Sequence, residues 1–168
     1  PVRISSDRRA YRPVWLSNEK ILFTSPRGPE TEFSESWRLV SVMLSGRDEK
    51  LVEPANAKAF SPAVSPDAQT IAFIGPQDQV LLQTQTGLKS LVSPQGPVTG
   101  YPQTWLPDGQ RLAVSNDDGC IAFRIDGSGG QAIEDVSECE IAWSPDGRRA
   151  VYQKDDAIWI MNADGTDR

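Results

Sequence analysis

The sequence contains no histidine, and it has only two cysteines and two methionines among its 168 residues. Without an imidazole, the chain cannot build a Ser-His-Asp triad, a Cys-His pair or the usual histidine-ligated metal site. It also lacks the G-x-S-x-G nucleophile motif and the G-x-x-x-x-G-K-S/T phosphate loop. We therefore predict that the chain is not an enzyme, that it has no catalytic residues, and that it holds neither a cofactor nor a metal.

Acidic residues outnumber basic ones, and the sequence has no long apolar run. The formal net charge is −6, which disfavours nonspecific binding to nucleic acid because such binding needs a basic surface. No apolar run approaches the roughly 18 residues of a membrane-spanning helix, so we predict no membrane span. The sequence begins with Pro1, and the lack of a signal peptide therefore says nothing about export.

A motif that returns four times is the main feature that the sequence does contain. The intervals between the first residues of the copies are 49, 41 and 38 residues. Periods of about 40–45 residues that contain several short strands are typical of β-propeller blades. The copies are W-L-S-N-E-K-I-L-F at Trp15–Phe23, V-S-P-D-A-Q-T-I-A-F at Val64–Phe73, W-L-P-D-G-Q-R-L-A-V at Trp105–Val114 and W-S-P-D-G-R-R-A-V at Trp143–Val151.

Each unit has the same predicted order of strands and turns. In the last unit, strands are expected at Glu140–Trp143, Arg149–Gln153 and Ala157–Met161. The Pro-Asp-Gly segment between the first two supplies residues that suit a tight turn. Fourth strands are expected at Asp48–Val52, Lys89–Val92 and Gln131–Ile133. The repeated Asp67, Asp108 and Asp146 are interpreted as turn residues and not as catalytic acids.

The last unit lacks a fourth strand, and the N-terminus carries a candidate for it. Val2–Ser5 precedes the first strand at Tyr11–Trp15. The 25 residues after Trp143 and the 15 residues up to and including Trp15 together make one further period of 40. We therefore predict that Val2–Ser5 pairs with Ile158–Met161. A sheet closed in this way leaves no free edge.

The predicted fold is all-β: a single β-propeller domain over residues 1–168, with four four-stranded blades, the last closed by the N-terminal strand. The blades span about 6–52, 53–92, 93–133 and 134–168, the last completed by 1–5. The alternatives are half of an eight-bladed dimer or a fragment of a larger propeller, so the chain is expected to be a monomer or a homodimer.

The tryptophans and cysteines add two further expectations. Trp15, Trp105 and Trp143 end first strands, where large rings are expected to pack between blades. Cys120 and Cys139 fall at strand ends that share one face of a propeller. They are compatible with a disulfide, but we favour free thiols because cysteines on adjacent blades are often too far apart to be bridged.

The segments S-P-D-G-R-R-A-V-Y at Ser144–Tyr152 and I-W-I-M-N-A-D-G-T-D-R at Ile158–Arg168 resemble the TolB-type (WD-like) β-propeller repeat. The resemblance covers nearly the whole chain in four copies and is strongest in the last two. It implies an extracytoplasmic protein, periplasmic or secreted, that acts as a protein- or peptide-binding module without catalysis. The alternative is a carbohydrate-binding or enzyme-associated propeller domain.

The partner is expected to bind where the turns between strands two and three and between strands four and one surround the channel mouth. Arginines gather in these turns of the first blade and aspartates in those of the third and fourth, an asymmetry that would orient a partner. The segment Ser25–Glu35 is the one long insertion, and long loops on a rigid scaffold often carry recognition. The predicted partner-binding residues are Arg8, Arg9, Arg12, Arg27, Phe33, Asp117, Asp118, Asp155 and Asp156.

Overall fold

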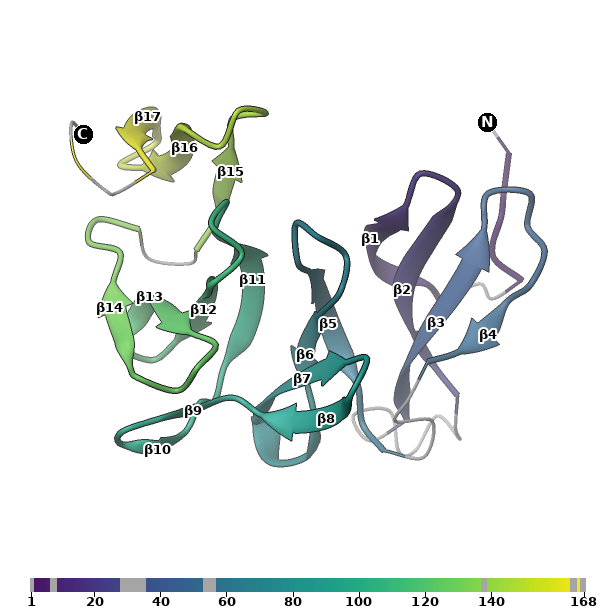
Figure 1. Cartoon of the computed structure of the whole chain (residues 1–168). Coiled ribbons are helices and arrows are strands. Elements are labelled where there is room, and N and C mark those ends of the chain that lie inside the picture. The colour runs from purple at the N-terminus through teal and green to yellow at the C-terminus, as the bar shows by residue number, and fades with distance from the viewer. Residues whose placement is uncertain are drawn as a thin grey trace.

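The computed structural model describes residues 2–6, 9–27, 36–52, 57–136, 139–163 and 166. In this part of the chain, four antiparallel sheets of three or four strands follow one another along an open arc, with a two-stranded sheet between the second and third (Figure 1). The one helical element there is a three-residue turn, η2 (Pro76–Asp78). No helix among the described residues is long and apolar enough to cross a membrane. The protein is all-β.

The sheets have their strands in sequence order. The first sheet comprises β1 (Tyr11–Ser17), β2 (Lys20–Pro26), β3 (Trp37–Met43) and β4 (Lys50–Leu51). The second comprises β5 (Phe60–Val64), β6 (Ile71–Ile74), β7 (Val80–Thr84) and β8 (Gly87–Ser90). The hairpin β9 (Val92–Ser93) and β10 (Gly96–Pro97) leads to the third sheet, which comprises β11 (Tyr101–Trp105), β12 (Arg111–Asn116), β13 (Gly119–Arg124) and β14 (Gly130–Ala132). The fourth comprises β15 (Ile141–Trp143), β16 (Arg149–Lys154) and β17 (Ala157–Asn162).

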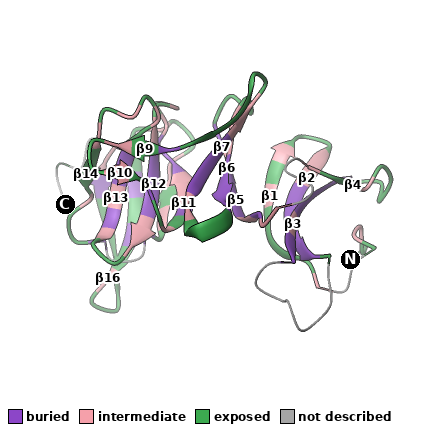
Figure 2. Ribbon diagram, turned by 90° about the horizontal axis from the view of Figure 1, so that it is seen from below, coloured by how far each residue is buried: buried purple, intermediate pink, exposed green. Residues whose placement is uncertain are grey.

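The predicted order of strands and turns is confirmed, including the short fourth strands, which correspond to β4, β8 and β14. Successive side chains of a strand point to opposite faces, so each middle sheet packs against both neighbours. In β12, Leu112 and Val114 pack against the second sheet, whereas Ala113 packs against the fourth. Figure 2 shows the buried residues along β2, β3, β5, β6 and β7. The hydrophobic core therefore lies between the sheets.

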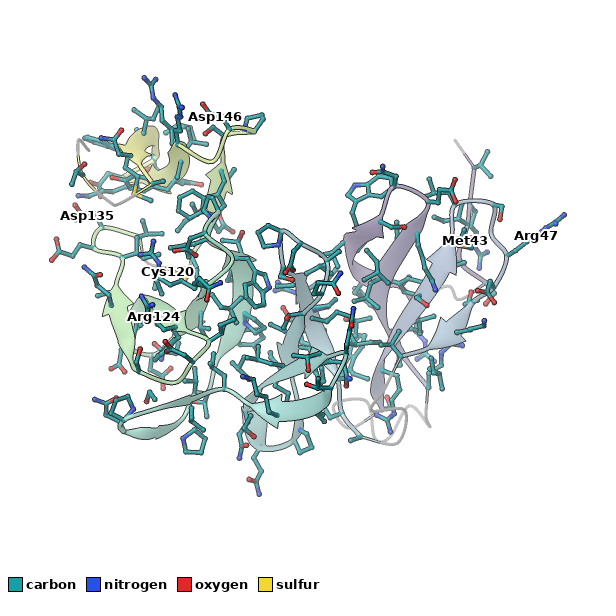
Figure 3. The ribbon with its side chains drawn as sticks, viewed as in Figure 1. Met43, Arg47, Cys120, Arg124, Asp135 and Asp146 are labelled. Carbon is teal, nitrogen blue, oxygen red and sulfur yellow. A yellow bond between two sulfur atoms is a disulfide. The ribbon has the colours of Figure 1, made fainter. Side chains whose placement is uncertain are left out.

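The repeated aspartates stabilise the turn between the first and second strands. Asp146 Oδ1 accepts hydrogen bonds from Ser144 Oγ at 2.6 Å and from the Arg148 N–H at 3.0 Å (Figure 3). The Ser144 hydroxyl and the Arg148 amide lower the pKa of the Asp146 carboxyl below its ordinary value of 3.8. The carboxylate thus accepts a hydrogen bond from a backbone N–H that the turn would otherwise leave without a partner in the protein.

The second and third units also place an aspartate at this position of the turn. Asp67 Oδ1 accepts the Ser65 hydroxyl at 2.6 Å and the Gln69 N–H at 3.0 Å, and the serine again lowers the pKa of the Asp67 carboxyl. Partial burial of Asp108 opposes ionisation, but hydrogen bonds from Gln110 and Arg111 still hold the pKa of Asp108 below its ordinary value. The interpretation of these aspartates as turn residues is consistent with all three geometries.

The arc does not close through the N-terminal segment. Ile4 packs with Phe23, Val40 and Val42 on the outer face of the first sheet, and the Ser6 N–H donates to Glu49 at 2.9 Å. The N- and C-terminal segments lie at opposite ends of the arc (Figure 1). The predicted pairing of Val2–Ser5 with Ile158–Met161 is therefore wrong, because the outer face of the first sheet takes up Ile4.

The tryptophans divide between the core and the surface. Trp105 is buried, and its Nε1–H donates to the carbonyl of Ala63 at 3.1 Å, so it packs between the second and third sheets as expected. Trp143 is half-buried. Trp15 is 63% exposed, and the expectation that it packs between blades is wrong, because within the described residues no other sheet covers its side of the first sheet.

Cys120 and Cys139 form a disulfide with a Cα–Cα distance of 5.0 Å. Cys120 lies on the face of β13 that contacts the fourth sheet (Figure 3), and Cys139 takes a left-handed φ of 55° just before β15. This backbone conformation brings the two residues within the range that a disulfide requires. The interpretation as free thiols is therefore wrong.

Candidate functional site

The innermost strands of the first three sheets each begin with an aromatic residue and a β-bulge. Tyr11, Phe60 and Tyr101 are the first residues of β1, β5 and β11. The strand register shifts just after each of them. A bulge bends a strand and redirects its side chains, so the residues at these positions turn out of their sheets.

The aromatic residues form a row across the sheets. The ring centroids of Tyr11 and Trp37 are 5.3 Å apart, and those of Trp37 and Phe60 are 5.0 Å apart. Phe60 and Tyr101 follow with centroids 6.4 Å apart, in an edge-on arrangement. Such geometries are favourable between aromatic rings. These ring contacts hold the aromatic side chains in a row, against which Arg12 packs.

Arg12 reaches along this row from the first sheet. Its guanidinium carbon lies 5.7 Å from the centroid of Phe60 and 6.0 Å from that of Tyr101. The residue has a φ of 48°, a left-handed conformation that is unfavourable for an L-residue other than glycine. Cation–π attraction of about 0.5–1 kcal/mol helps to hold the side chain in place.

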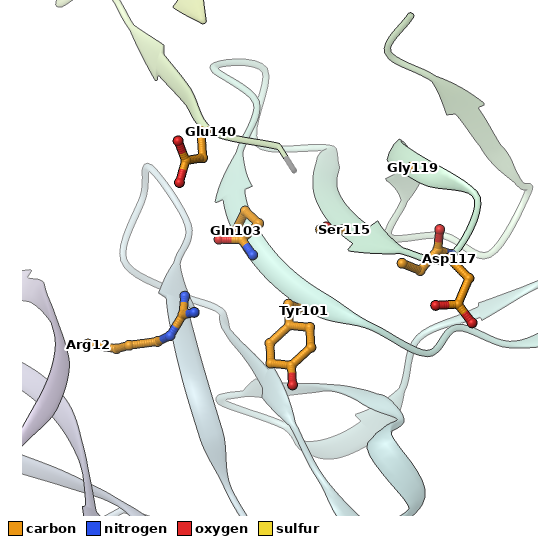
Figure 4. Close-up of a pocket in the computed structure, with 8 residues that line it drawn as sticks. Arg12, Tyr101, Gln103, Ser115, Asp117, Gly119 and Glu140 are labelled. Atoms are coloured by element: carbon orange, nitrogen blue, oxygen red, sulfur yellow. The ribbon is translucent and has the colours of Figure 1, made fainter. Parts of the chain in front are cut away.

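A cavity of about 600 Å³ opens beside this arginine (Figure 4). Its lining comes from the first sheet, from the third, and from Glu140, the residue before β15 of the fourth. Figure 4 shows the Arg12 guanidinium on one side, Tyr101 and Gln103 beside it, and Asp117 across from it. The lining residues are Arg12, Tyr101, Gln103, Ser115, Asn116, Asp117, Gly119 and Glu140.

The backbone at the base of the cavity needs a glycine. Gly100 has a φ of 118°, and a Cβ there would lie 2.4 Å from the carbonyl oxygen of Ser115. The absence of a side chain lets the start of β11 approach the end of β12. Asn116 Oδ1 accepts the N–H of Asp118 at 3.0 Å, which fixes the β12–β13 turn that presents Asp117.

The cavity offers both hydrogen-bond donors and acceptors. Arg12 contributes a permanent cation, and Asp117 and Glu140 contribute carboxylates. Tyr101 is 48% exposed and presents part of its ring to the cavity. Among the described residues, no group of three or more His, Cys, Asp or Glu side chains gathers as a metal site would require. The arrangement suits a polar ligand that both donates and accepts hydrogen bonds.

A second depression lies between the third and fourth sheets. Its volume is about 440 Å³, and Asp118 and Asp155 are among its lining residues. Lys154 spans it by an ion pair with Asp135 at 2.9 Å, and this partner raises the pKa of Lys154. The lysine thus offsets part of the negative charge there.

The predicted partner-binding residues fall into different places. Arg12 and Asp117 meet at the cavity, and Asp118 and Asp155 line the second depression. Asp156 lies in the exposed turn between β16 and β17. Arg27 forms an ion pair with Glu49 at 2.8 Å beside the first sheet, away from the cavity. Arg9 precedes β1 and is half-buried, and Arg8 and Phe33 lie outside the described residues.

Tyr101, Gln103, Ser115 and Glu140 were not predicted. An alignment of the repeats would have found part of the set, because Tyr11, Phe60 and Tyr101 each stand four residues before the residue that opens the repeated motif. Glu140 occupies the position of Arg12 in the fourth unit, three residues before its tryptophan. Ser115 has no such signal, since it reaches the cavity only through the approach of β11 to β12.

Comparison with known proteins identifies the fold through solved structures. No protein-family model and no curated protein matches the sequence. TolB from Acinetobacter baumannii superposes with a TM-score of 0.59 at 17% identity, over 88% of this chain and 39% of TolB. A Xanthomonas campestris gluconolactonase superposes with a TM-score of 0.56 at 17% identity, over 87% of this chain and 54% of the enzyme.

A Bacteroides thetaiotaomicron protein of unknown function superposes with a TM-score of 0.54 at 11% identity, over 92% of this chain and 43% of that protein. This chain therefore spans about two fifths to one half of the length of the proteins that it matches. At these identities, the likeness shows the fold.

The gluconolactonase corrects one prediction. We predicted that the chain is not an enzyme, mainly because it lacks histidine, yet a protein with this fold is an enzyme. Fold and missing motifs are therefore insufficient grounds for that prediction. The resemblance to the TolB-type repeat is confirmed at the level of the fold: this chain has the β-propeller type of fold found in TolB.

Proposed function

We propose that residues 1–168 form four consecutive blades of one β-propeller domain that binds a segment of a protein or peptide in the cavity beside Arg12. The observation that carries the proposal is the convergence of three sheets on one polar cavity. Concave sites with a few well-placed polar groups are the usual form of a binding site.

The chemistry of the cavity favours a peptide segment. Backbone amides offer donors and acceptors in alternation, and the cavity provides both partners through Gln103, Ser115 and Asn116. Arg12 would pair with a carboxylate of the ligand, whereas Asp117 and Glu140 would pair with a cationic side chain or an amino terminus. The TolB-like fold agrees with a protein partner.

An extracytoplasmic location belongs to the same proposal. The disulfide between Cys120 and Cys139 supports it, because disulfides persist mainly in oxidising compartments. The resemblance to the TolB-type repeat also supports this location, because it implies an extracytoplasmic protein.

A carbohydrate is the second candidate ligand, and the exposed ring of Tyr101 favours it. An aromatic face beside amide and carboxylate groups offers both stacking and hydrogen bonds to a sugar. A gluconolactonase has the same fold. The second candidate therefore includes a sugar-directed or enzyme-associated propeller.

Selection from a random peptide library, together with a panel of oligosaccharides and sugar lactones, would separate the two candidates. We expect the protein to retain peptides, and Arg12→Gln to weaken their binding at least about tenfold. Arg124→Gln is the matched control, since Arg124 is exposed on β13 outside the cavity. Sugars that bind wild type and are lost with Tyr101→Leu would favour the second candidate. Ligands that bind wild type and Arg12→Gln equally would overturn the proposed site.

A further inference from the structure

The disulfide lies directly beside the cavity. At one end of the bond, Cys120 follows Gly119, which lines the cavity. At the other end, Cys139 precedes Glu140, which lines the cavity as well. The Cα atoms of the two cysteines are 5.0 Å apart. The bond therefore joins the start of β13 to the segment that brings Glu140 to the cavity.

The strands of the neighbouring sheet do not hold this segment in place. The first strands of the first three sheets lie against one another, β1 against β5 and β5 against β11. Within the described part of the chain, β15 makes no contact of comparable extent with β11 (Figure 1). Glu140 stands immediately before β15, so the position of its backbone depends on other restraints.

Cys139 supplies these restraints. Its side chain is buried in the core between the third and fourth sheets, and its carbonyl accepts the Ile141 N–H at 2.8 Å. Its φ of 55° is left-handed, which is unfavourable for an L-residue other than glycine. Such a conformation persists only where the surroundings impose it. The bond to Cys120 is the covalent part of those surroundings.

The two carboxylates of the cavity differ in what positions them. Asp117 lies in the β12–β13 turn of the third sheet, which the hydrogen bond from the Asp118 N–H to Asn116 fixes at 3.0 Å. Glu140 is exposed, and among the described residues its carboxylate has no hydrogen-bond or ion-pair partner. Its placement therefore follows from the backbone that Cys139 holds.

The packing of the fourth sheet on the third does not depend on the disulfide alone. Ala150, Tyr152 and Met161 of the fourth sheet are buried in one cluster with Ala113 and Ala122 of the third. We therefore expect the two sheets to stay packed without the bond, because this buried apolar contact remains. The local consequence of losing the bond is freedom of the segment before β15.

We propose that the disulfide between Cys120 and Cys139 positions Glu140 in the cavity, so that the affinity of the cavity for a cationic group depends on the bond. Glu140 contacts the ligand, and the cysteines act through it as positioning residues. A carboxylate held in place pairs with a cation at a lower entropic cost than a mobile one. The inference rests on the proposed function, since it concerns the ligand of the same cavity.

Titration calorimetry on a variant without the bond tests the inference. Cys120→Ala with Cys139→Ala removes the disulfide and leaves no buried hydroxyl or thiol in its place. The ligands are a peptide selected on wild type and the same peptide with its cationic group acetylated. The alanine variant should bind the first at least about tenfold more weakly and the second within about twofold of wild type. Binding of the acetylated peptide, which still pairs with Arg12, shows that the cavity is folded.

A second set of variants separates positioning from loss of stability. Glu140→Gln alone should weaken binding of the cationic peptide about tenfold, and adding the alanine substitutions should weaken it no further. In Asp117→Asn, the matched control, the alanine substitutions should still lower the affinity. Met161→Ala is the control for stability, because Met161 is buried in the same core cluster and does not line the cavity. It should leave both affinities unchanged.

Hydrogen exchange followed by NMR tests the positioning without a ligand. The Ile141 N–H should exchange at least about tenfold faster in the alanine variant, whereas the amides paired between β12 and β13 should keep their rates. A selection that returns no peptide dependent on Arg12 would overturn the proposed function and this inference together. A selected peptide without a cationic group, an equal loss of affinity for both peptides, or unchanged exchange at Ile141 would overturn this inference alone.

Discussion

The first strands of the sheets end at the repeated turn (the turn end) and begin near the position of the strand bulge (the bulge end). The residues at these two ends differ in how far they repeat from unit to unit. At the turn end, Asp67 and Asp146 make the same two hydrogen bonds, to a serine hydroxyl and a backbone amide. At the bulge end, the side chains do not repeat: the same position of the sequence repeat carries Arg12 in the first unit and Glu140 in the fourth.

This difference separates stability from recognition. Identical residues with identical bonds serve the turns of the second and fourth units, so their substitution should change the free energy of unfolding. Different residues at the same position of the repeat line one cavity, so their substitution should change binding. The following experiments are ordered from the largest expected effect to the smallest.

The fourth unit is the exception at the bulge end, because Cys139 stands where the other units have an aromatic residue. Replacing Cys120 and Cys139 with serine should lower the free energy of unfolding by about 3 kcal/mol, since the disulfide restricts the unfolded chain. Urea denaturation measures this loss. Wild type treated with reductant should match the double variant, and an unchanged midpoint would show that the pair contributes no stability.

Arg12→Gln should weaken ligand binding at least about tenfold and leave the free energy of unfolding within about 0.5 kcal/mol. The physical reason is that Arg12 contacts the half-buried ring of Phe60 and the exposed ring of Tyr101, and it belongs to no hydrophobic core cluster of the described residues. Titration calorimetry with a peptide selected on wild type gives the first quantity, and urea denaturation gives the second. A large loss of stability would instead make Arg12 a structural residue.

The turn end offers a pair of opposite substitutions. Ala68 has a φ of 57° and Gly109 a φ of 64° at the same position of the turn. Ala68→Gly should raise the free energy of unfolding by about 1 kcal/mol, and Gly109→Ala should lower it by a similar amount. A Cβ on Gly109 would meet no atom within 4 Å, so this loss would report backbone strain alone. Changes of the same sign in both variants would contradict this reading of the turn.

Acid should have the smallest effect. The pKa values of Asp67 and Asp146 are lowered in the folded chain, so near pH 4 the unfolded chain binds more protons than the folded one. The stability that these carboxylates contribute is therefore present above pH 4 and lost as the pH falls through the folded pKa values. Replacing Ser65 and Ser144 with alanine should flatten the slope of unfolding free energy against pH, and an unchanged slope would exclude the serines as its cause.

The sequence predicted the features that depend on local chemistry. Alternating apolar residues and Pro-Asp-Gly segments determine strands and turns within a few residues, which is why β16 and the Asp146 turn were predicted correctly. Closure depends instead on competition between two distant apolar surfaces, and Ile4 occupies the nearer one. The cavity likewise depends on contacts between sheets, so Ser115 and Glu140 could not be inferred from their neighbours in the sequence.

A comparison of Arg12→Gln with Gly109→Ala tests the division between the two ends most directly. Ligand affinity and the free energy of unfolding would be measured for both variants with one peptide selected on wild type. The bulge variant is expected to lose affinity at unchanged stability, and the turn variant to lose stability at unchanged affinity. If affinity and stability fall together in both variants, the two ends do not have separate roles and the proposed division is wrong.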